Sequence, residues 1–141
     1  MNLDLAELNW LAIIVAALAT FFLGGLWYTA LFGKAWQKAY GFSDEKLAQM
    51  RKDRPPPVFF GTMIVCYVII AFVTALLVQA AGVESAAGGA LLGLLLWIGI
   101  AATVKLTDHI ASDHPMSAYG IDAVYQLIYL VMIGAIIGGW R

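Results

Sequence analysis

The sequence predicts an all-α, polytopic membrane protein with four transmembrane helices and one short interfacial helix in the first cytoplasmic loop. Hydrophobic residues make up 62% of the 141 residues and charged residues only 12%, about half the charged share of a soluble domain. Apolar residues also form four long runs that are separated by short polar segments. These runs cover residues 9–32, 58–81, 86–106 and 118–140.

Each run is long enough to cross a bilayer as a helix. About 20 helical residues span ~30 Å, the thickness of the hydrocarbon core, and each run carries at most one formal charge. A spanning helix satisfies every backbone N–H and C=O within itself, which an open strand in lipid does not. We therefore expect a single transmembrane domain over residues 1–141, with too little chain outside the bilayer to bury a second core.

The first run, 9–32, is expected to be a retained helix rather than a signal peptide. Asp4 and Glu7 precede it and no Lys or Arg does, whereas a signal peptide begins with a basic region. The second run contains the single Cys66, so no disulfide within the chain is possible.

A short helix is predicted in the loop between the first two runs. Ser43 is a suitable N-cap, acidic residues follow it, and basic residues gather towards the end, an order that matches the helix dipole. Pro55–Pro57 then ends this helix and begins the second run. We interpret the helix as a topogenic and lipid-anchoring segment or, alternatively, as a docking site for a partner. Its charged residues are Asp44, Glu45, Arg51, Lys52 and Arg54.

The distribution of positive charge predicts the orientation. Six of the eight Lys and Arg residues lie in the first loop, namely Lys34, Lys38, Lys46, Arg51, Lys52 and Arg54. The second loop offers only Glu84, and the third has Lys105 beside two histidines. By the positive-inside rule the first and third loops are cytoplasmic and both termini lie outside, with Arg141 as a single opposing charge.

Small and aromatic residues predict how the helices pack and where they meet the membrane surface. Gly89 with Gly93, and Gly134 with Gly138, form G-x-x-x-G pairs that permit close helix contact. The sequence leaves open whether these faces meet within one chain or between chains, and we expect a homo-oligomer. Trp97 lies near the centre of the third run and is expected to pack between helices. Interface anchors are expected at Trp10, Tyr28, Trp36, Tyr40, Tyr119 and Trp140.

A polar stripe marks one face of the fourth run. Its members follow i, i+3, i+4, i+7 spacing and therefore share a helix face that should point into the bundle or towards a partner chain. Asp122 is either an N-terminal carboxylate that stabilises its own helix and pairs with Lys105, or a deeper proton carrier. The predicted stripe consists of Asp122, Tyr125, Gln126 and Tyr129, faced by Thr103 and Lys105 from the third run.

The third loop repeats an Asp-His dipeptide, at Asp108–His109 and at Asp113–His114. Two imidazoles with nearby carboxylates are ligands for Zn²⁺ or another divalent ion. His109 and His114 do not share a helix face, so such a site needs a turn between them, and Pro115 favours one. The alternative is a pair of solvated loop histidines.

The motif W-Y-x-x-L-F-G-x-x-W, formed here by Trp27, Tyr28, Phe32, Gly33 and Trp36, is the most distinctive pattern in the chain. Together with the stretches 95–99, 121–125 and 132–140, it resembles an uncharacterised bacterial family of small four-helix inner-membrane proteins. The resemblance covers almost the whole chain. It implies the fold and a bacterial inner-membrane location, but no activity, cofactor or catalytic residue.

Function is less constrained than fold. The chain has no phosphate-binding glycine loop and no H-E-x-x-H helix, its net charge of −1 gives no basis for nucleic-acid binding, and no cofactor is implied. The leading hypothesis is an oligomeric channel or transporter for a proton, an ion or a small solute, with its path between protomers. The alternative is a non-transport scaffold or binding protein for lipid, metal or a partner. A membrane enzyme is a third possibility, based only on the Asp-His pairs.

Overall fold

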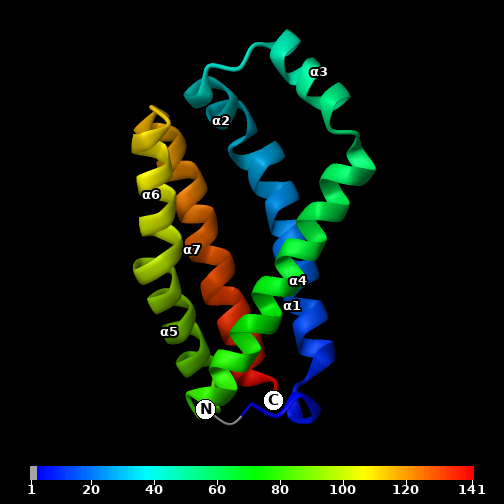
Figure 1. Cartoon of the computed structure of the whole chain (residues 1–141), viewed down its shortest axis with the longest axis vertical. Helices are drawn as coiled ribbons and strands as arrows, with labels where there is room; N and C mark the ends of the chain where they lie inside the picture. Colours follow the sequence, from blue (N-terminus) through cyan, green and yellow to red (C-terminus); the bar gives the residue numbers. More distant parts are fainter. Residues whose placement is uncertain (1–2) are drawn as a thin grey trace.

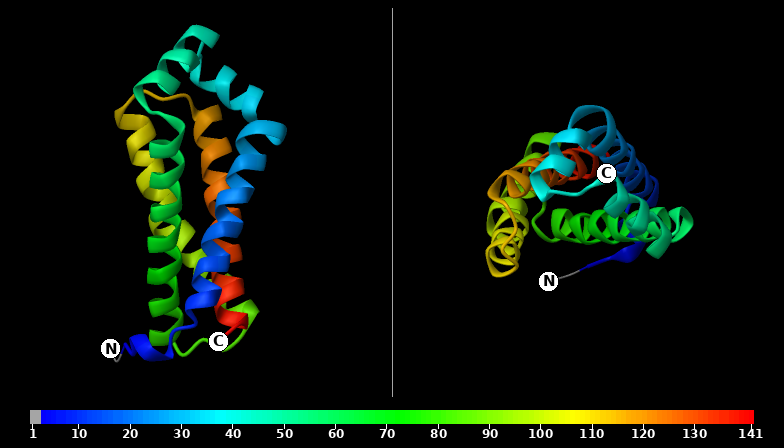
Figure 2. Two further views of the ribbon diagram at one scale, coloured as in Figure 1. Left: turned by 90° about the vertical axis from the view of Figure 1, so that its right-hand side faces the viewer. Right: turned by 90° about the horizontal axis from the view of Figure 1, so that it is seen from above.

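The computed structural model describes residues 3–141, and this part of the chain is helical without any strand (Figure 1). Four helical segments are long and apolar enough to cross a membrane, which confirms the predicted fold class. They run side by side, and both termini lie at the same end of the bundle (Figure 2). The segments are Trp10–Leu31, Pro56–Ala80, Ala86–Ala111 and Met116–Gly139.

The first segment follows a short 3₁₀ turn, η1 (Leu5–Glu7), and consists of α1 (Trp10–Leu26) and a π-helical segment, η2 (Trp27–Leu31). Asn9 caps α1 by accepting a hydrogen bond from the Ala12 N–H at 3.0 Å. Phe32 has φ −125° and ψ 10°, so the chain leaves helical geometry there before the next helix starts.

The first loop contains two helices where the sequence predicts one. The predicted helix is α3 (Asp44–Asp53), and its Ser43 cap accepts from the Lys46 N–H at 3.1 Å. The additional helix is α2 (Gly33–Tyr40). It ends at Gly41, whose φ of +70° is a left-handed conformation that glycine adopts without strain. Its mixed composition carries no long apolar run, which is why it was not predicted.

The remaining segments form two long helices and one interrupted helix. The second membrane segment is α4 (Pro56–Ala80) and the fourth is α7 (Met116–Gly139). The third comprises α5 (Ala86–Leu96), a second π-helical segment, η3 (Trp97–Ala101), and α6 (Ala102–Ala111). Helix α6 continues beyond the apolar run predicted to end at 106, because helical hydrogen bonding persists through its polar last turn.

The two G-x-x-x-G faces meet each other within the chain. A Cβ atom placed on Gly89 would overlap the Gly134 carbonyl, and one placed on Gly93 would overlap the Leu130 carbonyl. Gly138 also packs directly on the Gly89 backbone. The glycine faces therefore meet within one chain. They join α5 to α7, where close backbone contact gains van der Waals energy.

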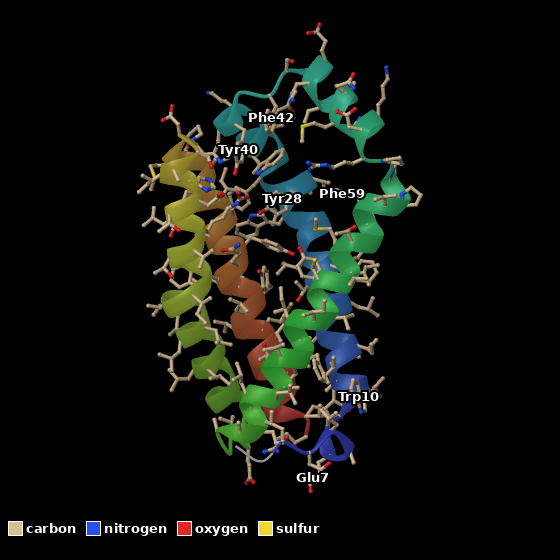
Figure 3. The ribbon with its side chains drawn as sticks, in the orientation of Figure 1. Glu7, Trp10, Tyr28, Tyr40, Phe42 and Phe59 are labelled. Carbon is tan, nitrogen blue, oxygen red and sulfur yellow. The ribbon has the colours of Figure 1, made fainter. Side chains whose placement is uncertain are left out.

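The core is apolar at the end of the bundle that holds the termini. Ile13 of α1, Val78 of α4 and Ile133 of α7 are at most 1% exposed. Small alanines surround them and let the helices approach closely. The opposite end, where the loops are, is polar instead, because tyrosines and charged groups gather there (Figure 3).

Candidate functional site

The carboxylate of Asp122 is the centre of the polar site. It lies in the second turn of α7 and is only 7% exposed. Its Oδ1 accepts a hydrogen bond from the Tyr28 hydroxyl at 2.7 Å, and its Oδ2 accepts one from the Tyr40 hydroxyl at 2.8 Å. The ammonium of Lys105 lies 3.4 Å from Oδ2. Segments η2, α2, α6 and α7 therefore converge on one carboxyl group, which satisfies its charge inside the bundle.

Tyr40 connects this carboxylate to a buried imidazole. Its hydroxyl oxygen lies 3.2 Å from Nε2 of His109, a side chain with no exposed surface. Nδ1 of the same ring lies 3.2 Å from the Lys105 carbonyl oxygen, which can only accept a hydrogen bond, so Nδ1 carries a proton. The exposed His114 packs against this ring, with centroids 5.2 Å apart. The network therefore runs from within α7 to the loop surface.

The Asp122–Tyr40–His109 contacts accommodate two proton arrangements because Tyr40 has one proton to donate. In the first, Tyr40 donates to an ionised Asp122 and accepts from Nε2–H of a charged His109. In the second, a protonated Asp122 donates to Tyr40, which donates to Nε2 of a neutral His109. The heavy atoms are the same in both cases, and only protons change position. Such a chain is suited to moving a proton between carboxyl and imidazole.

Burial raises the pKa of the Tyr40 phenol above its usual value, and the hydrogen bond to Asp122 and the charges of Asp122 and Asp108 raise it further. The phenol therefore stays protonated at neutral pH. Tyr40 can then act as a hydrogen-bonded link between the two groups without becoming a tyrosinate.

Two tryptophans hold α7 on either side of Asp122. The indole N–H of Trp27 donates to the Ile121 carbonyl at 3.2 Å, and that of Trp97 donates to the Ala123 carbonyl at 2.7 Å. Each tryptophan is the first residue of a π-helical segment. Such segments are rare and occur frequently at functional sites. These two hydrogen bonds fix the position of the Asp122 turn along the bundle and its rotation about the α7 axis.

The other residues of the predicted stripe occupy different environments. Tyr125 and Tyr129 are buried, and the Tyr125 hydroxyl donates to the Thr20 carbonyl at 2.9 Å, with the Tyr67 hydroxyl 3.0 Å away. Gln126 is half-buried, and its Oε1 has no hydrogen-bond donor among residues 3–141. These three side chains lie deeper along α7 than Asp122 and do not hydrogen-bond to it.

The prediction that Thr103 faces the stripe is wrong. Its side chain is exposed, and its hydroxyl donates to the Gly99 and Ile100 carbonyls of its own helix at 3.1 and 3.0 Å. The π-helical segment η3 precedes it, and a π turn holds more residues than an α turn. Residues after η3 are therefore displaced around the helix axis relative to a uniform α-helix. Because Thr103 and Lys105 are two positions apart and do not share a helix face, only Lys105 reaches Asp122.

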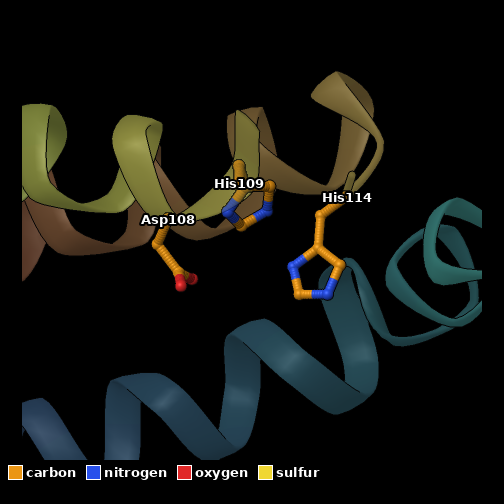
Figure 4. Close-up of side chains that lie close together, drawn as sticks. All are labelled: Asp108, His109 and His114. Atoms are coloured by element: carbon orange, nitrogen blue, oxygen red, sulfur yellow. The ribbon is translucent and has the colours of Figure 1, made fainter. Parts of the chain in front are cut away.

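Three of the four predicted metal ligands come together at the end of α6. Donor atoms of Asp108, His109 and His114 lie within 4.8 Å of one another (Figure 4). The expected turn lies between the histidines, and Asp113 occupies it with φ 55°, outside the group of three. Both ring nitrogens of His109 already contact protein oxygens, so a metal would have to displace one of them. Metal binding here stays a prediction.

The W-Y-x-x-L-F-G-x-x-W motif builds the frame of the site. A Cβ atom on Gly33 would lie 2.8 Å from the Tyr28 carbonyl oxygen, so only glycine fits where η2 passes into α2. The Trp36 ring packs against Tyr28 and Tyr40, with centroids 6.0 and 5.0 Å away. The motif thereby carries both phenols to Asp122. The sequence missed Tyr40 as a site residue, and its i+4 spacing from Trp36 was the available signal.

This fold and this site define a small multi-pass helical membrane protein with a buried, tyrosine-bound carboxylate between its helices. The chain belongs to the family described as "Protein of unknown function (DUF1761)", whose sequence profile matches residues 11–138. The expected membership of an uncharacterised family is thus confirmed. No curated protein and no solved structure matches the chain significantly.

Proposed function

We propose that this protein moves protons, or a small solute whose movement is coupled to protons, across the bacterial inner membrane, with Asp122 as the group that gains and loses the proton. The observation that carries the proposal is the continuous contact from Asp122 through Tyr40 to His109. An ionisable residue within a transmembrane helix is energetically unfavourable unless it has a partner, and such residues commonly serve proton or ion movement.

The ion pair gives a means of coupling. An ionised Asp122 attracts the Lys105 ammonium 3.4 Å away, and a protonated Asp122 does not. Gain of a proton therefore weakens the link between α6 and α7, and loss of the proton restores it. A solute that binds one of these two charge states better than the other becomes coupled to the proton.

The remaining path is proposed to lie between copies of the chain. Beyond Tyr129, the buried residues of α7 are Leu130, Ile133, Gly134, Ile137 and Gly138. All five are apolar, and Gly134 and Gly138 pack against the α5 backbone, so the polar network of one chain reaches only part of the way across. We propose an oligomer that completes the path, with the basic first loop cytoplasmic and both termini outside.

A non-transport scaffold or binding role is the second candidate, and one observation favours it. The Asp122 carboxylate accepts two hydrogen bonds and pairs with one ammonium, and these contacts tie η2, α2 and α6 to α7. In this case they are interhelical contacts, each stabilising the bundle by about 0.6 kcal/mol on average.

Proton flux into liposomes tests the proposal and separates the two candidates. Wild-type protein, D122N and D53N are reconstituted, a pH gradient and a membrane potential are imposed, and internal pH is followed with a dye. D53N is the matched control because it neutralises an exposed carboxylate of α3 that accepts a hydrogen bond from Gln49 of the same helix, away from the Asp122 network. We expect wild-type and D53N proteoliposomes to be leakier to protons than empty liposomes, and D122N to match the empty ones.

Thermal unfolding of the same variants in detergent provides the structural control. A stable, helical D122N that has lost flux supports the transport role. Wild-type flux no greater than that of empty liposomes contradicts proton movement. Loss of stability in D122N, with no wild-type flux, supports the scaffold role.

A further inference from the structure

A basic groove lies beside the Asp122 site, at the end of the bundle where the loops are. It has a volume of about 320 Å³ and lies between η2, α2 and α3. Of these segments, α2 and α3 extend beyond the four long helices (Figure 1). The groove is lined by Tyr28, Thr29, Gly33, Lys34, Trp36, Gln37, Leu47 and Arg51.

The charge of this groove is positive and unpaired. Lys34 comes from α2 and Arg51 from α3, so two cations far apart in sequence line the same space. Neither has a carboxylate within 4.0 Å among residues 3–141, where the one ion pair is Lys105 with Asp122. The indole N–H of Trp36 likewise donates to no protein acceptor in this described part. Three donors therefore remain available to a ligand that enters the groove.

The position of the groove matches the depth of lipid headgroups. The first apolar segment ends at Leu31 and the second begins at Pro56, so the groove lies just beyond the two ends. Tryptophan and tyrosine prefer this depth, since one part of the ring is in apolar surroundings and the other in polar ones. Exposed Leu31 and Phe59 lie on the adjacent membrane segments and offer apolar surface for acyl chains.

We infer that this groove binds the phosphate headgroup of an anionic phospholipid. The Arg51 guanidinium can contact two phosphate oxygens at once, and the Lys34 ammonium acts as a compact positive charge beside it. A lipid held there bridges α2 to α3, two helices that are also joined by a three-residue turn, 41–43, and by the hydrogen bond from Gln37 Nε2 to Asp44 Oδ1 at 3.2 Å. Tyr28 belongs to both the groove and the Asp122 network, but the inference does not need the proposed proton movement, because it rests on the charges of Lys34 and Arg51.

Native mass spectrometry in detergent tests this inference. The protein is titrated with phosphatidylglycerol, with phosphatidylcholine and with inorganic phosphate. We expect wild-type protein to retain phosphatidylglycerol in preference to the other two. Because both cations that face the headgroup are removed, K34Q/R51Q should lower the retained fraction by about tenfold or more.

The matched control is K46Q/K52Q, which removes two charges from the same loop at exposed positions outside the groove. It should retain phosphatidylglycerol as the wild type does. Equal losses in the two double variants would overturn the inference in favour of diffuse surface charge. Equal retention of phosphatidylcholine would also overturn it, and displacement by inorganic phosphate at the same concentration would reassign the groove to a free anion.

The single variants K34Q and R51Q keep the inference testable if the double variant does not fold. Each should lose part of the retained lipid, and each should keep the helical circular dichroism and the melting temperature of the wild type. A single variant that folds normally and retains phosphatidylglycerol fully would show that its cation does not hold the headgroup.

Discussion

Tyr40 is the residue on which the polar site depends most, because its hydroxyl contacts both Asp122 and Nε2 of His109. Its ring also packs against Trp36 and Phe42, with centroids 5.0 and 5.2 Å away. This aromatic surround removes water from the phenol and holds its hydroxyl between a carboxyl group and an imidazole. Substitution with phenylalanine would leave the ring packing in place and interrupt only the hydrogen-bonded chain.

At alkaline pH, we expect Y40F to lose less stability than the wild type. Burial and the hydrogen bond to Asp122 raise the pKa of Tyr40 in the folded protein above the usual value of a tyrosine, about 10. Above pH 10 the unfolded chain therefore releases a phenolic proton that the folded protein still holds, and stability falls as pH rises through that range. Melting temperatures of both proteins, measured from neutral pH to beyond pH 10, check this. Parallel losses in both proteins would contradict it.

At the scale of elements, the contact between α5 and α7 is the closest in the bundle, because glycine meets glycine along both helices. A carbonyl oxygen cannot swing away from a new methyl group as the end of a flexible side chain can. The packing of these two helices thus depends on the absence of side chains at four positions, Gly89, Gly93, Gly134 and Gly138. This contact also sets the position of η3, and hence of Trp97, against α7.

G134A should therefore destabilise the protein, and G120A should not. A Cβ atom at Gly134 would overlap the Gly89 carbonyl, whereas one at Gly120 of the same helix meets nothing within 4 Å. Overpacking of this kind typically lowers the free energy of unfolding by about 1–3 kcal/mol, while alanine in an open helical position is favourable. Unfolding in mixed detergent, followed by circular dichroism, measures the difference. Equal stability of the two variants would show that α5 and α7 do not approach this closely.

At the scale of the whole molecule, the positions of the loops relative to the membrane decide from which side the Asp122 network and the basic groove are reached. The first and third loops lie at one end of the bundle and both termini at the other (Figure 2). The Asp122 network and the basic groove are both at the loop end. A cytoplasmic loop end would give both of them access to the cytoplasmic leaflet.

Thiol labelling checks this orientation. In a C66A background, E45C lies in the first loop and E84C in the second, and both positions are exposed. We expect a membrane-impermeant thiol reagent to label E84C in intact cells and E45C only after the cells are permeabilised. The reverse pattern would place the basic loop outside and contradict the proposed orientation.

Features that depend on short stretches of chain can be predicted from the sequence alone. The length and apolarity of each run predict a membrane span because lipid acts on each helix separately. The Ser43 cap and the two G-x-x-x-G pairs are equally local patterns. Family membership also follows from the sequence, since the matching profile covers residues 11–138. Burial of Asp122 and its pairing with Lys105 agree with the i, i+3, i+4 pattern and with the nearest available cation.

The residues that complete the site come together only in the folded chain. Tyr40 and His109 are 69 positions apart, and they meet because α2 folds back over the end of α6. The π-helical segment η3 changes the direction in which later residues of the third membrane segment face, so that Lys105 lies on Asp122 and Thr103 is exposed. Trp27 of η2 and Trp97 of η3 both donate hydrogen bonds to the same turn of α7. These contacts join segments distant in sequence, and their geometry depends on how whole helices pack.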